Sequence, residues 1–200
     1  MRNLCLFFLL FFTCAHASGQ SSGGTFFDKL YLPFGIGYTL SPGGGIQSGF
    51  VLSTSAEVRI KDRQGIFLRF NYNSRTNNYR NGAVDNTNAI IGKINADDFL
   101  LGMGYRFKVY KRISAFALVQ GGMSDYSYPY ITSLTNGYKV SQQSKMVPVM
   151  AGIGGIEFYF VKSAAIFIEG SYLYHIKQPF IKNNNYDVPG ISVGITTKLF

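Results

Sequence analysis

The chain has 200 residues, of which 14% are charged and 16% aromatic, and its formal net charge is +9. Ordinary soluble domains contain roughly 25% charged residues, so the charged fraction of this chain is low for a soluble domain. The length suits one domain. Beyond the first residues there is no run of about 20 apolar residues, which excludes an ordinary transmembrane helix.

The N-terminal residues predict a secretory signal peptide over residues 1–17. Arg2 precedes an uncharged apolar run over residues 4–12, and Ala15-His16-Ala17 is a small-x-small cleavage site. A lipoprotein signal with its lipid on Cys14 is an alternative, although the residues before Cys14 fit that signal poorly. The other cysteine, Cys5, also lies in this segment. The expected mature chain therefore has no thiol, disulfide or cysteine metal site.

The rest of the chain alternates between apolar and polar residues with a period of two, which is typical of β-strands that separate two environments. Residues 18–29, rich in Gly and Ser, predict an irregular lead-in. In the clearest segment, Ile166 and Ile168 share one face, whereas Glu169 and His175 share the other. Eight such segments are predicted, over residues 30–40, 49–60, 66–74, 98–109, 114–126, 146–160, 164–176 and 188–200.

The connections between these segments alternate in length. Short polar turns are predicted at residues 61–65, 110–112 and 161–163, and long loops at residues 75–95, 128–144 and 177–187. Short turns at one end, longer loops at the other and an even strand count are typical of membrane-spanning barrels. We therefore predict an all-β fold, an eight-stranded antiparallel up-and-down transmembrane β-barrel over residues 30–200. Pro148 cannot donate to a ladder, so it is expected near the loop end of its strand.

The charges indicate which face of the strands points inward. Each strand carries only about two charged residues, of both signs, which would leave a water-facing exterior poorly solvated but can fill a narrow lumen. Burying one charge alone costs several kcal/mol, so these charges are expected to pair. The predicted polar lumen network is Glu57, Arg59, Arg69, Arg106, Gln120, Glu157, Glu169 and His175. An eight-stranded barrel is just wide enough for side chains to fill, so an open channel is not expected.

Tyrosines near the strand ends are expected on the lipid-facing side as an aromatic girdle. The predicted girdle is Tyr31, Tyr38, Tyr72, Tyr105, Tyr172 and Tyr174.

The signal peptide, the eight alternating strands and the aromatic residue Phe200 resemble the small outer-membrane β-barrel family of OmpA/OmpX type. The resemblance implies a bacterial outer-membrane location, a periplasmic lead-in, and Phe200 as a signal to the barrel-insertion machinery. The family pattern also has apolar residues at alternate positions before that aromatic. Here Ile191, Val193 and Ile195 are one step out of phase with Phe200. A bulge near Thr197 is predicted to reconcile the two phases.

No catalytic arrangement emerges from the sequence. His175 is the only histidine of the expected mature chain, and Ser171 lies roughly 13 Å away along the strand, beyond hydrogen-bond reach. Asp97 and Asp98 are expected at a solvated strand end, and neither a metal nor a cofactor is expected. The predicted function is a monomeric, non-enzymatic outer-membrane barrel with a structural or surface-interaction role. Outer-membrane lipids or lipopolysaccharide, and not nucleic acid, are the expected counterions.

Two alternatives remain open. Eight-stranded outer-membrane barrels also include lipid A-modifying enzymes of deacylase or acyltransferase type, and a small pore is the other possibility.

Overall fold

The computed structural model describes residues 29–41, 45–80, 90–135, 137–176 and 187–199. The predicted signal peptide, almost all of the predicted lead-in and Phe200 lie outside these ranges. In the described part of the chain, no helix is long and apolar enough to cross a membrane.

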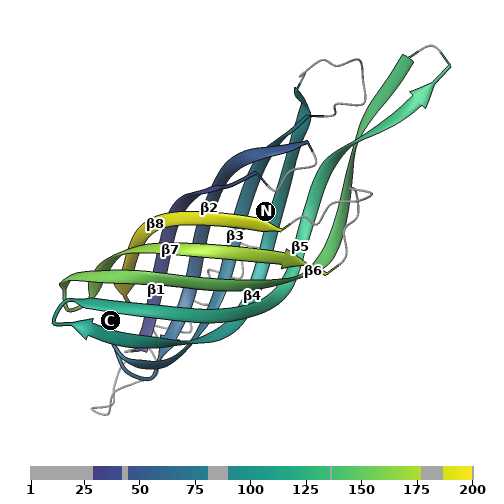
Figure 1. The fold of residues 1–200 in the computed structure, drawn as a ribbon. Helices are drawn as coiled ribbons and strands as arrows, with labels where there is room; N and C mark the ends of the chain where they lie inside the picture. Colours follow the sequence, from purple (N-terminus) through teal and green to yellow (C-terminus); the bar gives the residue numbers. More distant parts are fainter. Residues whose placement is uncertain (1–28, 42–44, 81–89, 136, 177–186, 200) are drawn as a thin grey trace.

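Eight antiparallel strands form one closed barrel (Figure 1). Each strand pairs with the next in the chain, and β1 pairs with β8 to close the ring. This confirms the predicted fold class. The strands are β1 Leu30–Thr39, β2 Ile46–Arg59, β3 Gly65–Arg80, β4 Ile90–Tyr110, β5 Ile113–Leu134, β6 Gly137–Val161, β7 Ala164–His175 and β8 Val188–Lys198.

The outer face of the barrel is apolar and the inner face carries the polar groups. On β4, Leu101 and Met103 are each 63% exposed, whereas Arg106 is 1% exposed. The same alternation runs through the other strands, as the sequence predicts. Five of the six expected girdle tyrosines point outward or are half-exposed. Tyr31 is the exception and is fully buried, because it shares the inward phase of Gly35 on β1.

Two of the predicted long loops are wrong. β3 and β4 stay paired as far as Arg80 and Ile90, and β5 and β6 as far as Leu134 and Gly137. The β5–β6 hairpin therefore projects beyond the barrel wall (Figure 1). Toward the loop end the outward positions are polar, as at Ser74 and Thr76 on β3, so the period-two signal fades while the ladder of hydrogen bonds continues.

Pro148 lies well inside β6 rather than near its end, because β6 starts at Gly137. Its carbonyl oxygen accepts a hydrogen bond of 3.2 Å from the backbone N–H of Ile176, where β7 has just ended. Pro148 thus marks the level at which β6 loses its β7 neighbour and the projecting hairpin begins.

The predicted bulge near Thr197 is also wrong. The register of β8 runs without interruption through Thr197 against both β1 and β7. Ile191, Val193 and Ile195 face outward, and Thr196 is buried inside. The apolar face of β8 therefore points outward without an irregularity in the strand.

Adjacent glycines on β5 predict opposite responses to a methyl group. A Cβ at Gly122 would lie 1.9 Å from the carbonyl oxygen of Phe99, whereas a Cβ at Gly121 would meet nothing within 4 Å. We expect Gly122→Ala to lower the free energy of unfolding by about 1–3 kcal/mol, and Gly121→Ala to change it little. Urea unfolding in detergent micelles measures both. Equal effects of the two substitutions would contradict the close approach of β4 and β5.

Candidate functional site

The end of the barrel at the three short turns β2–β3, β4–β5 and β6–β7 is here called the turn end, and the opposite end the loop end. The interior of the turn end holds three arginines and three glutamates, here named the turn-end cluster. Its members are Glu57, Arg59, Arg69, Arg106, Glu157 and Glu169, from β2, β3, β4, β6 and β7. All six side chains are at most 6% exposed. The alternation of each strand brings them inward, and closure of the barrel brings the strands together.

Glu57 is the centre of this cluster. It accepts from Arg69 Nε at 2.7 Å and from Arg106 Nη1 at 2.8 Å, and it also binds Arg59 Nε. Arg59 and Arg106 reach Glu157 at 3.0 and 2.8 Å as well, and Arg69 reaches Glu169 at 3.1 Å. Each guanidinium therefore contacts two carboxylates, and the six charges cancel. Such mutual pairing offsets the cost of removing the ions from water.

Aromatic rings surround the cluster. Tyr159 donates a hydrogen bond of 2.6 Å to Glu157 Oε2, and the Arg59 guanidinium lies 3.7 Å from the centre of the Tyr31 ring. Phe67 and Phe116 pack edge to face with ring centres 6.2 Å apart. Sequence reasoning did not include Tyr31 or Tyr159 in the network, although both share the inward phase of their strands. These rings fill the space between the ions.

Neutral side chains occupy the middle of the interior. Ser55 donates to Asn71 Oδ1 at 2.5 Å, Asn71 Nδ2 donates to Gln120 Oε1 at 2.8 Å, and Gln120 Nε2 donates to the Arg69 carbonyl at 3.1 Å. Gln120 faces inward, as its predicted phase on β5 requires. The chain of amides joins β2, β3 and β5 across the lumen.

A second charged group lies toward the loop end and is here named the loop-end cluster. Arg75 forms two hydrogen bonds to Asp98, with Nε–Oδ2 at 2.7 Å and Nη2–Oδ1 at 2.8 Å. Ser124 donates to Asp98 at 2.5 Å, and Arg75 Nη2 also donates to the Tyr126 hydroxyl at 3.0 Å. The Tyr126 hydroxyl in turn contacts His175 Nε2. His175 is therefore part of a buried network that spans β3, β4, β5 and β7.

The sequence did not predict the loop-end cluster, apart from the inward position of His175. Arg75 was assigned to a loop and Asp98 to a solvated strand end, but Arg75 is 1% and Asp98 0% exposed. The available signal was phase, because Arg75 is in step with Arg69, Asn71 and Asn73 on β3. The long-loop assignment concealed it.

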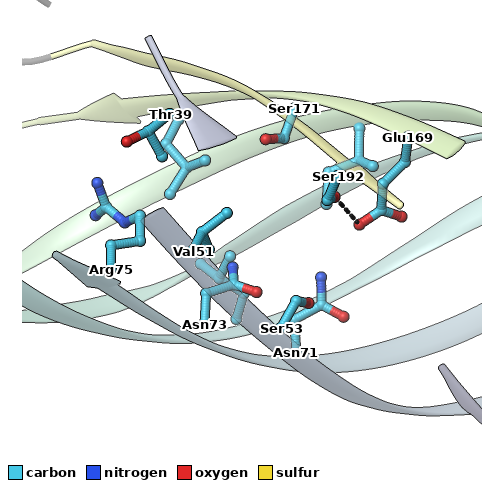
Figure 2. A pocket seen from close by; sticks show the side chains of 12 residues that line it. Thr39, Val51, Ser53, Asn71, Asn73, Arg75, Glu169, Ser171 and Ser192 are labelled. Atoms are coloured by element: carbon cyan, nitrogen blue, oxygen red, sulfur yellow. Dashed lines mark hydrogen bonds between the residues drawn. The ribbon is translucent and has the colours of Figure 1, made fainter. Parts of the chain in front are cut away.

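A small cavity with a mixed polar and apolar lining separates the two clusters (Figure 2). Arg75 and Asn73 lie on one side, and Glu169, bonded to Ser192 at 3.3 Å, lies on the other. The space open to the centre of a water-sized sphere is about 20 Å³, enough for roughly one or two water molecules. At this level the interior is thus packed with side chains and retains room for little more than water.

The described residues contain no group of three or more His, Cys, Asp or Glu that could hold a metal ion. The geometry favours a structural network, because its carboxylates, guanidiniums and imidazole bond chiefly to one another and not to an open cleft.

Comparison with solved structures agrees with this architecture. The chain is similar to the crystal structure of Neisserial surface protein A (NspA), with 15% sequence identity, a TM-score of 0.55, and coverage of 86% of this chain and 97% of that one. The N-terminal β-barrel domain of Pseudomonas aeruginosa OprF matches with 14% identity, a TM-score of 0.47, and coverage of 84% and 98%.

Yersinia pestis Ail, in complex with the heparin analogue sucrose octasulfate, matches with 12% identity, a TM-score of 0.47, and coverage of 84% and 98%. No protein-family model matches the sequence, and no curated protein sequence matches it. At these identities the likeness shows the fold alone, which is the eight-stranded barrel of small outer-membrane proteins.

Proposed function

We propose that this protein is a non-enzymatic β-barrel of the bacterial outer membrane with a structural or surface-interaction role. The observation that carries the proposal is the distribution of side chains: apolar groups cover the outside, and ion pairs fill the inside. That arrangement suits a hydrocarbon environment and would be unstable as a water-exposed exterior. The exposed apolar side chains on the outside of the barrel, such as Leu101 and Met103 on β4, are here named the apolar belt. Outer-membrane lipids contact this belt, and the barrel-insertion machinery assembles the monomer.

The filled interior favours this function over a small pore. Arg69, Arg106 and Glu57 bridge strands across the turn end, and Phe67 and Phe116 close the space beside them. An eight-stranded barrel has no spare width beyond its own side chains. Ions would have to displace a charge-balanced network to pass.

The position of His175 favours a non-enzymatic role over lipid A modification. An acyl chain lies outside the barrel, whereas His175 is 3% exposed and faces the interior. Its Nε2 is engaged by the Tyr126 hydroxyl, which also accepts from Arg75. A lipid substrate on the outer face would have no path to the imidazole.

The projecting β5–β6 hairpin is the proposed contact surface for partners outside the cell. Beyond Ser127 on β5 and beyond Val149 on β6, the two strands pair only with each other. Tyr130 and Val140 are exposed on this ribbon. Because the ribbon projects beyond the barrel, these side chains are accessible to a partner.

Single cysteines test the location and the orientation together, because the expected mature chain has no other thiol. Thr135 is exposed at the tip of the β5–β6 hairpin, and Ser163 is exposed in the β6–β7 turn. In intact cells of a host with an outer membrane, a membrane-impermeant maleimide is expected to label Thr135→Cys strongly. Ser163→Cys is expected to react only after the outer membrane is permeabilised.

The two variants control for each other, since both carry one exposed thiol on the same barrel. Labelling of Ser163→Cys but not Thr135→Cys in intact cells would reverse the proposed orientation. Recovery of both variants in the soluble fraction would contradict an outer-membrane location.

A further inference from the structure

Positive charge is concentrated at the turn end of the barrel. Among the described residues, this end carries only one outward carboxylate, that of Asp62. Its basic residues come from all three turns, from the last residues of β4, and from the chain beside the ring closure between β1 and β8. They are Lys29, Lys61, Arg63, Lys108, Lys111, Arg112, Lys162 and Lys198.

The remaining described charges nearly balance. In the interior, four arginines face four carboxylates within the turn-end and loop-end clusters. At the loop end, the described basic residues are Arg80, Lys93, Lys139 and Lys145, and the acidic residues are Asp97, Asp125 and Asp187. Nearly all of the positive charge that the described residues carry in excess therefore belongs to the turn end.

Most of these cations are available to a ligand. Among these eight turn-end cations, only Lys198 forms an ion pair with a described group, Asp62, at 3.8 Å. Arg63 is used within the fold: its Nη1 donates to the Lys111 carbonyl at 2.8 Å, and its guanidinium lies 4.6 Å from the centre of the Tyr159 ring. The side chains of Lys61, Lys108, Lys111, Arg112 and Lys162 are exposed.

The cations lie directly beside the end of the apolar belt. Val109 and Tyr110, which precede Lys111, are 64% and 66% exposed, and Val161, which precedes Lys162, is 50% exposed. If the apolar groups reach the edge of the hydrocarbon, the neighbouring ammonium groups lie at the level of the headgroups. Continuity with the lipid-facing belt favours lipid over a soluble ligand.

We infer that the turn end is a binding surface for the phosphate headgroups of anionic phospholipids, such as phosphatidylglycerol. Basic residues near an anionic bilayer surface attract its headgroups, and a ring of them gathers such lipids around the barrel. The inference rests on the proposed function only in requiring that the barrel lies in a bilayer. In the proposed orientation these lipids belong to the leaflet opposite lipopolysaccharide, so most of the positive charge that the described residues carry in excess lies on the inner side.

Electron spin resonance of spin-labelled lipids tests the inference on the folded barrel in phosphatidylcholine vesicles. Labelled phosphatidylglycerol is expected to associate with the barrel at least about fivefold more strongly than labelled phosphatidylcholine at low salt. The preference should largely disappear at about 1 M salt, where the screening length is about 3 Å. This salt series uses the unmodified protein and so does not depend on any variant folding.

Two triple variants locate the lipid site with the same change in charge. Replacing Lys108, Lys111 and Lys162 by glutamine is expected to reduce the preference to less than about half. The matched control replaces Lys93, Lys139 and Lys145 at the loop end by glutamine and should retain it.

The inference is overturned if the unmodified barrel shows no preference for phosphatidylglycerol over phosphatidylcholine. It is also overturned if only the loop-end variant loses that preference. Binding of soluble polyglutamate by the turn end without any lipid preference would indicate an acidic protein partner and would also overturn it. Insertion is assessed separately by the shift of the unboiled band on a gel. A barrel that inserts but shows no preference removes this inference alone, whereas a chain that stays in solution without detergent removes the proposed function too.

Discussion

Replacing Glu57 by glutamine is expected to lower the free energy of unfolding by about 3–5 kcal/mol, the usual cost of removing one partner of a buried ion pair. Glu57 binds Arg59, Arg69 and Arg106, and its side chain is fully buried. Glutamine keeps the shape but leaves three buried guanidiniums with two carboxylates. Urea unfolding in lipid vesicles, followed by the shift of the unboiled band, measures the change.

Two further variants show whether charge balance causes the loss. Adding Arg69→Gln to Glu57→Gln restores equal numbers of positive and negative groups, so the double variant should lose less than the two single losses combined. Asp62→Asn removes an exposed carboxylate with a 3.8 Å contact to Lys198 and should cost about 0–1 kcal/mol. If Glu57→Gln lowers the free energy of unfolding no more than Asp62→Asn does, the turn-end cluster does not stabilise the barrel.

The barrel wall was predictable because each strand separates two environments. Ile166, Ile168 and Glu169 on β7 follow the same alternation between an apolar outside and a polar lumen as the other strands, so phase and strand order follow from the sequence. The partners inside the lumen were not predictable. Glu57 and Arg69 are direct cross-strand neighbours, whereas Arg59 and Glu157 meet only because the sheet closes into a ring.

The misassigned segments lie where neither face of the strand is apolar. Toward the loop end of β3, Thr76 and Asn78 point outward and are polar, while Asn77 is buried inside, so apolar–polar alternation no longer reports a strand. That loss concealed Arg75, and with it the loop-end cluster. Tyr31 was misplaced for another reason: its residue type suggested a girdle position, while its phase on β1 placed it inside. Phase was the stronger indicator.

Depth along the outer belt gives a direct test of the membrane environment. Met103 and Val109 both face outward from β4 and are 63% and 64% exposed. Met103 lies near the middle of the belt that runs from Phe99 to Val109, whereas Val109 lies at its turn end. In lipid vesicles, Met103→Arg is expected to lower the free energy of unfolding by about 2–4 kcal/mol and Val109→Arg by about 0–1 kcal/mol. In water, the two arginine substitutions would cost a similar free energy, because the two positions are almost equally exposed. Only a hydrocarbon layer makes the cost of a guanidinium depend on its depth, so equal small losses at both positions would contradict a lipid-facing belt.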